Sequence, residues 1–268
     1  MILASASSAG LLCALGAALA YGVAAVAAPR IGDGATRLVL LAAWLLHALT
    51  LALGLVESPA RFGFAPALSV TAWLVLTVYA VESHVLPELN ARWALSGLGA
   101  AAVLVAQLFP GAPLPAVAST WLPLHWALGI ASYGLFAAAV VHAALMTRAE
   151  RRIRLAADPR SGVPLLTLER LTFRFVGAGF LLLTATLLAG WLFGQHLYGT
   201  TGVGWKWDHK SVFSVLSWLT FATLLIGRAR FGWRGRRAVR FLYAGATLLL
   251  LGYAGSRFVL EVILGRSA

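Results

Sequence analysis

The sequence has few charged residues and almost no cysteine. Only 11% of its 268 residues are charged, against roughly 25% in a typical soluble domain. The one cysteine, Cys13, lies inside an apolar run, so this sequence holds no disulfide framework, CxxC redox pair or CxxCH motif. It also lacks the GxxxxGK[ST], GxGxxG and HExxH patterns. These absences leave a water-soluble enzyme, a nucleotide hydrolase and a dinucleotide-binding protein without support.

Long apolar runs are abundant instead. Hydrophobic residues make up 60% of the chain and the mean hydropathy is +0.85. A helix needs about 20 mainly apolar residues to cross a membrane. Eight such runs are present: Ile2–Ala28, Leu38–Val56, Phe64–Val81, Trp93–Phe109, Leu122–Met146, Phe175–Phe193, Ser211–Ile226 and Phe241–Leu264. The sequence therefore predicts an all-α polytopic membrane protein with eight transmembrane helices, and residues 1–268 form a single integral-membrane domain.

The basic residues are distributed unevenly between the two sets of connections. Of the 21 lysines and arginines, sixteen lie on alternate connections, starting with the one after the first run, and three on the intervening ones. Basic loops stay on the cytoplasmic side of a membrane. The distribution predicts that both termini lie on the outer side of the membrane, which in a bacterial inner (plasma) membrane is the periplasmic side. The basic clusters indicate topology signals and contacts with membrane lipids. They lack interleaved aromatic residues, so no nucleic acid partner is expected.

The connection between the sixth and seventh runs carries the most informative segment. It includes Trp205, Trp207 and Asp208 in a glycine-rich, polar stretch on the predicted outer side. Asp208 is placed to cap the seventh helix, with Ser211 three residues later. Tryptophans at this position are typical of the membrane interface. Alternatively, the two indoles form a flat apolar platform on which a planar macrocycle such as haem would stack.

This segment resembles the tryptophan-rich WWD segment of the cytochrome c assembly (CcsA/CcmC-type) family of haem-handling proteins. The match rests on Trp205, Trp207, Asp208 and Lys210, with Trp218 further on. Residues 124–136 are similar to the family helix that opens with a histidine, here His125. Three short stretches resemble the small inner-membrane, YpjD-like branch: residues 168–173, 232–237 and 253–257. The resemblance covers most of residues 120–268.

The resemblance implies that haem b is bound non-covalently at the periplasmic face. Trp205 and Trp207 would pack on the macrocycle, Asp208 would hold the loop, and His125 would ligate the iron. The implied partners are apocytochrome c or other cytochrome assembly proteins, which makes the chain an assembly factor more than an enzyme. The sequence departs from the family at His209, where a proline is usual, at Ser211, where a glutamate is usual, and in having no histidine after Phe258.

Other histidines and one arginine are further candidates. His142 follows His125 by 17 residues on one helix, about 25 Å deeper, so the two cannot share an iron. His47 and His142 could form a lower haem site, or both could be packing histidines. His209, like His196, could replace the absent second outer ligand. Arg257 could hold a haem propionate or Asp208, could pair with Glu261, or could extend its charge to the membrane surface.

Two other functions fit parts of the sequence. One is a haem-free accessory subunit of a membrane complex that docks through arginine loops, and it would lose its partner on charge reversal of Arg234, Arg236 and Arg237. The other is a small polytopic transporter whose path is lined by His47. A pigment spectrum of the isolated protein separates both from a haem-binding protein.

Overall fold

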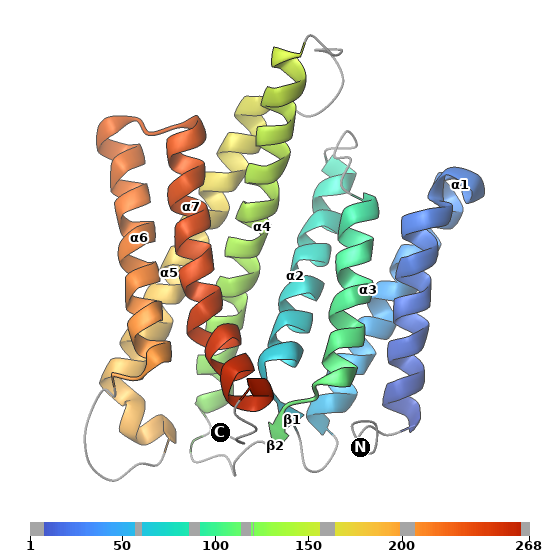
Figure 1. The fold of residues 1–268 in the computed structure, drawn as a ribbon, viewed down its shortest axis with the longest axis horizontal. Coiled ribbons are helices and arrows are strands. Elements are labelled where there is room, and N and C mark those ends of the chain that lie inside the picture. Colours follow the sequence, from blue (N-terminus) through green and yellow to red (C-terminus); the bar gives the residue numbers. More distant parts are fainter. Residues whose placement is uncertain are drawn as a thin grey trace. The chain divides into compact units, whose positions relative to one another are not determined.

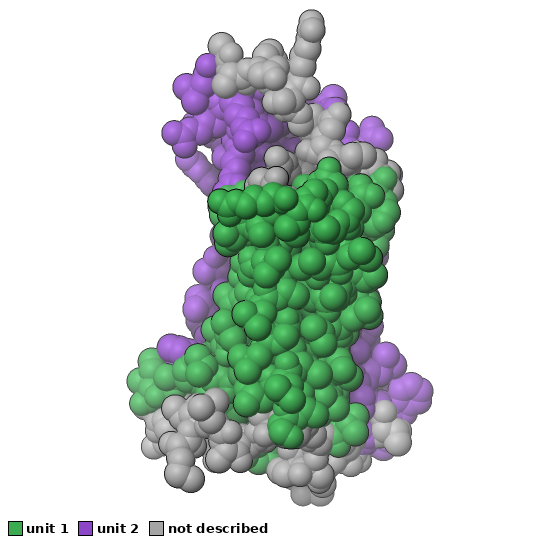
Figure 2. Space-filling view, turned by 90° about the vertical axis from the view of Figure 1, so that its right-hand side faces the viewer, with its two compact units in different colours: residues 1–114, 260–268 green, residues 115–259 purple. Residues whose placement is uncertain are grey.

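The computed structural model describes residues 8–56, 61–85, 92–113, 119, 121–155, 164–198 and 207–263, and these are almost entirely helical (Figure 1). The chain divides into two compact units (Figure 2). Unit 1 comprises residues 1–114 and 260–268, and unit 2 comprises residues 115–259. Each unit is described separately below.

Unit 1 is built from α1 (Ser8–Val56), α2 (Phe64–Val85) and α3 (Arg92–Leu108). The long α1 reverses direction at Gly32, whose φ of 76° and ψ of 165° are non-helical, so it consists of two spans (Figure 1). Glycine adopts positive φ without the steric cost other residues incur. The Thr36 hydroxyl donates a hydrogen bond to the Gly32 carbonyl over 2.7 Å. The first two predicted runs are therefore two antiparallel spans joined by this turn.

A small two-stranded sheet closes one end of unit 1. Strand β1 (Arg61–Phe62) pairs antiparallel with β2 (Ala112–Pro113). Gly111, with φ of 83°, precedes β2, and a Cβ there would lie 2.5 Å from the Phe62 backbone. The Arg61 guanidinium donates to the Gly111 carbonyl over 3.2 Å. The sequence analysis did not predict this sheet because two-residue strands have no detectable periodicity.

Unit 2 contains four long helical segments. They are α4 (Leu122–Arg154), α5 (Leu165–Tyr198), α6 (His209–Phe231) and α7 (Gly235–Leu250), the last continuing through η1 (Leu251–Gly255) and α8 (Ser256–Phe258). The chain goes on into η2 (Val259–Ile263), of which only Val259 belongs to unit 2. Phe136 and Phe221 stack in the core, with ring centroids 3.8 Å apart. Gly245 makes room for this pair, because a Cβ there would lie 2.8 Å from the Phe221 ring. The helices therefore pack tightly around an aromatic centre.

Seven helical spans among the described residues are long and apolar enough to cross a membrane, and α3 is a shorter apolar helix. The predicted polytopic all-α class is confirmed, and α3 corresponds to the fourth predicted run, Trp93–Phe109. Several predicted bounds were too short: α6 has 23 residues, and α4 and α5 extend into charged sequence. Helical hydrogen bonding continues past the apolar run because backbone bonds need no apolar side chains and arginine has a high helix propensity. Periplasmic termini stay a prediction.

Candidate functional site

The described part of the tryptophan-rich segment begins α6. The Asp208 carboxylate Oδ1 accepts a hydrogen bond from the Ser211 backbone N–H over 2.7 Å, and Asp208 has extended backbone angles. This confirms the predicted N-cap, which satisfies an otherwise unpaired donor of the first helical turn. The Trp207 side chain is 71% exposed. Trp205 lies outside the described residues, so the predicted pairing of the two indoles stays a prediction.

Lys210 lies near side chains of other helices at this end of unit 2. Its Nζ lies 5.4 Å from the centroid of the Tyr253 ring in η1. Lys210 is also within electrostatic range of His125 in the first turn of α4. The Asp208 carboxylate attracts this ammonium, and the Arg257 guanidinium in α8 is close enough to repel it. Figure 1 shows why: α4 and α6 begin, and the last helix ends, at the same end of this unit. The fold thus gathers an imidazole, an ammonium, a guanidinium and a phenol.

A widened helical turn sets the position of Tyr253 and Arg257. Residues Leu251–Gly255 adopt π-helical hydrogen bonding, a feature frequently found at functional sites. The Tyr133 hydroxyl on α4 donates to the Leu249 carbonyl over 2.8 Å, just before this turn. Gly252 lies against α6, where a Cβ would be 3.2 Å from Phe213. Tyr133 belongs to the stretch 124–136 that resembles the family helix, but neither its bond to α7 nor the π turn was predicted, because a π turn has no sequence signature comparable to a cap.

The two histidines of α4 differ in environment. His125 is half-buried near the start of the helix. His142 is only 3% exposed, its Nδ1–H donates to the Ala138 carbonyl over 2.8 Å, and its ring lies 5.2 Å from Phe175. This hydrogen bond places the ring's lone pair on Nε2, the tautomer typical of metal-ligating histidines. Both residues belong to one continuous helix, which agrees with the expected separation of about 25 Å.

His47 is fully buried in unit 1. Its Nε2 lies 2.9 Å from the Ser69 hydroxyl, and its Nδ1 lies 3.4 Å from the Tyr21 hydroxyl. Both ring nitrogens are therefore engaged by hydroxyl groups of neighbouring spans. His47 and His142 belong to different units, so the predicted lower site stays a prediction.

The remaining candidates are exposed or lie beyond the described side chains. His209 occupies the first position of α6 and is exposed, and His196 is exposed near the end of α5. The predicted pairing of Arg257 with Glu261 falls on a glutamate whose side chain is outside the described part of the structure. Within the described ranges, no three histidine, cysteine, aspartate or glutamate side chains gather as a metal site would require.

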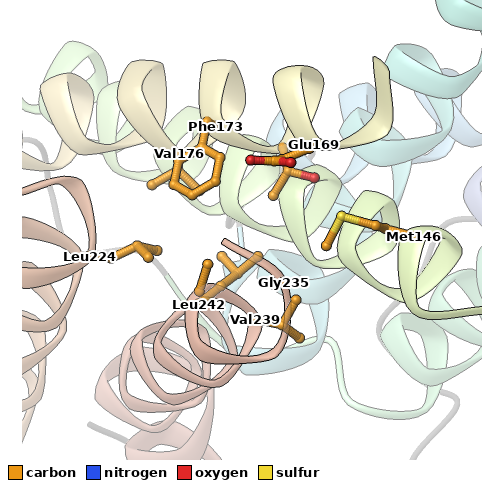
Figure 3. A pocket seen from close by; sticks show the side chains of 10 residues that line it. Met146, Glu169, Phe173, Val176, Leu224, Gly235, Val239 and Leu242 are labelled. Carbon is orange, nitrogen blue, oxygen red and sulfur yellow. The ribbon is translucent and has the colours of Figure 1, made fainter. Parts of the chain in front are cut away.

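A small pocket lies at the opposite end of unit 2 (Figure 3). Glu169 of α5 is its only charged lining residue. This carboxylate forms an ion pair with Arg228 and lies 3.5 Å from Arg234. The enclosed space is only about 10 Å³, which is no more than a water molecule needs and far below the roughly 300–1,000 Å³ typical of ligand pockets. The lining is otherwise apolar apart from Thr172, and no histidine borders the pocket.

Comparison with known proteins agrees with the motif. A family described as Cytochrome C assembly protein matches residues 34–264, most of the chain. An uncharacterized 28.8 kDa protein in the nifR3-like 5′ region of Azospirillum brasilense is 33% identical over 214 residues, which is 74% of this chain and 76% of that protein. The inner membrane protein YpjD of Escherichia coli (strain K12) is 39% identical over 100 residues, covering 37% of this chain and 36% of YpjD.

The cytochrome c biogenesis protein CcsA of Gloeobacter violaceus is 33% identical over 95 residues, covering 35% of this chain and 27% of CcsA. The alignments with YpjD and CcsA thus span only about a third of each of those proteins. No solved structure matches the chain. The family match spans well over half of the sequence and includes every helix of unit 2. The chain is a multi-pass membrane protein that belongs to the cytochrome c assembly protein family.

Proposed function

We propose that this protein binds haem b non-covalently at the end of unit 2 where α4 and α6 begin, and presents it to apocytochrome c or another cytochrome assembly protein on the periplasmic side. One observation carries the proposal. The Lys210 ammonium lies 5.4 Å from the centroid of the Tyr253 ring, and His125 and Arg257 are within electrostatic range of it, which supports a group of haem-compatible side chains beside the Trp207–Asp208 segment.

The groups at this end match the chemistry of haem. A histidine imidazole is a common axial ligand of haem iron, and His125 is the histidine within range of Lys210. Lys210 and Arg257 are cations suited to the two propionates, since charge-assisted hydrogen bonds to carboxylates are strong. The exposed indole of Trp207 offers an apolar face for the macrocycle. When bound, haem supplies the iron centre.

The chain's own residues supply binding and orientation. One carboxylate oxygen of Asp208 accepts a hydrogen bond from the Ser211 N–H, so the role of Asp208 is to hold the tryptophan segment at the start of the helix. Tyr133 anchors the π turn through the Leu249 carbonyl and so orients Tyr253 and Arg257. His125 is at the start of a 33-residue helix, which gives the imidazole a rigid base. Trp205 would complete the apolar face, and His209 is the exposed histidine nearest in sequence for a second ligand.

The test is the absorption spectrum of the purified full chain. We expect wild type from haem-replete cells to show a Soret band, and His125→Ala to lose or shift it. His84→Ala is the matched control, because His84 is an exposed histidine of unit 1 whose Nδ1 bonds its own helix at the Ala80 carbonyl. A colourless wild type refutes haem binding. An unchanged band in His125→Ala refutes the assigned ligand.

A further inference from the structure

The turn between α6 and α7 is held rigidly. α6 ends at Phe231 and is capped by Gly232 in the left-handed conformation, with φ of 62°. Gly235, with φ of 53°, begins α7. The Trp233 indole packs onto Gly227, where a Cβ would lie 2.3 Å from the ring. Because even a methyl group is excluded there, the turn has one close-packed arrangement.

One arginine of this turn, Arg228, makes its contacts within the protein. Arg228 forms an ion pair with Glu169, lies 4.6 Å from the centre of the Phe173 ring and donates to the Trp233 carbonyl over 3.3 Å. Its charge is therefore balanced by the carboxylate that borders the pocket in Figure 3. This ion pair links the turn to α5, and the same carboxylate is within ion-pair distance of Arg234.

The other arginines of the turn point outward. Five of them are exposed: Arg230, Arg234, Arg236, Arg237 and Arg240. No aspartate or glutamate occurs from His209 to Leu260 to balance them. Arg234 is 64% exposed although it lies 3.5 Å from Glu169, and the Arg237 guanidinium lies 3.9 Å from the Trp233 ring. The turn thus presents a dense, preorganised positive surface.

A dense positive surface favours an anionic ligand, and the position of the turn indicates where that anion comes from. It joins two helices that are long and apolar enough to cross a membrane, so it lies at the level of the lipid headgroups. Phe231 is 73% exposed beside the arginines, and aromatic residues at this depth are typical of the membrane interface. Arginine matches phosphate geometry through paired N–H donors. A phospholipid fits both features, because its phosphate can bind the arginines and its apolar part can contact Phe231.

We propose that residues Arg228–Arg240, here the arginine turn, form a binding site for the phosphate headgroups of anionic phospholipids. The site lies at the other end of unit 2 from Lys210 and does not depend on haem binding. Each exposed arginine is expected to contribute about fivefold to the affinity for an anionic surface. Arg237 contributes more than its charge, because Trp233 holds its guanidinium in place.

The test is native mass spectrometry of the full chain released from detergent with phosphatidylglycerol or phosphatidylcholine. We expect wild type to retain phosphatidylglycerol preferentially, and the triple variant Arg234→Gln, Arg236→Gln, Arg237→Gln to bind it at least tenfold more weakly. The control removes the same charge from the exposed end of α4 with Arg148→Gln, Arg151→Gln and Arg152→Gln. We expect less than a twofold change in the control.

A second variant distinguishes a loss of lipid binding from a loss of folding. Arg230→Gln with Arg236→Gln changes two exposed arginines and leaves the Glu169 ion pair and the Trp233 contact in place. We expect about 25-fold weaker phosphatidylglycerol binding, which is about fivefold for each arginine, with an unchanged melting temperature. Equal losses in the triple variant and its α4 control would overturn the proposal, as would a wild type without preference for the anionic lipid. Complete displacement by millimolar inorganic phosphate would assign the site to a free anion instead.

Discussion

Replacing Tyr133 by phenylalanine tests whether the π turn positions the haem-binding groups. The substitution removes only the hydroxyl that donates to the Leu249 carbonyl over 2.8 Å. An intramolecular hydrogen bond contributes about 0.5–1.5 kcal/mol net. If this bond holds η1 in the orientation that presents Tyr253 and Arg257, losing it lowers haem affinity by the same free energy, about two- to twelvefold. Haem titration of the apo-protein, followed at the Soret band, measures this change.

The control is Tyr243→Phe, which removes a hydroxyl from α7 without touching the π turn. Both variants remove one tyrosine hydroxyl from unit 2, so any change in haem affinity that follows from losing a hydroxyl in general appears in both. We expect wild-type haem affinity in Tyr243→Phe. Wild-type affinity in Tyr133→Phe as well would refute the positioning role, even if haem binds at this end. A fall of more than a hundredfold would exceed what one hydrogen bond explains and would point to unfolding.

Three further predictions follow from the packing and the charges. Lys210→Met reduces the preference for haem over its dimethyl ester, because the substitution removes one of the two ion pairs that esterification removes; an undiminished preference in competition titrations would exclude Lys210 as a propionate partner. His47→Ala leaves the buried Ser69 hydroxyl without its imidazole partner and lowers thermal stability by about 1–3 kcal/mol, while the Soret band stays unchanged. Gly245→Ala forces a Cβ to within 2.8 Å of the core aromatic ring and costs about 1–3 kcal/mol in a melting experiment, whereas Gly22→Ala, which meets nothing within 4 Å, shows no such loss.

The membrane class and the helix number followed from hydropathy because a transmembrane helix is defined by local composition. Each run satisfies its own hydrogen bonds and needs only an apolar solvent around it. The Asp208 cap was predictable for the same reason, since donor and acceptor are three residues apart. The bounds were less predictable, because α4 and α5 continue into arginine-rich sequence that hydropathy assigns to loops.

Contacts between distant residues decided the candidate site, and no local pattern contains them. Lys210 meets the Tyr253 ring across 43 positions of sequence, and Tyr133 meets the Leu249 carbonyl across 116. Which side chains converge depends on helix packing, which glycines such as Gly245 permit only in particular registers. Composition and short motifs alone therefore determined that this chain is a membrane protein of the cytochrome c assembly type. Only the tertiary structure decided which groups stand beside the tryptophan segment and that His47 is enclosed by hydroxyls, because packing is a property of the whole helix bundle.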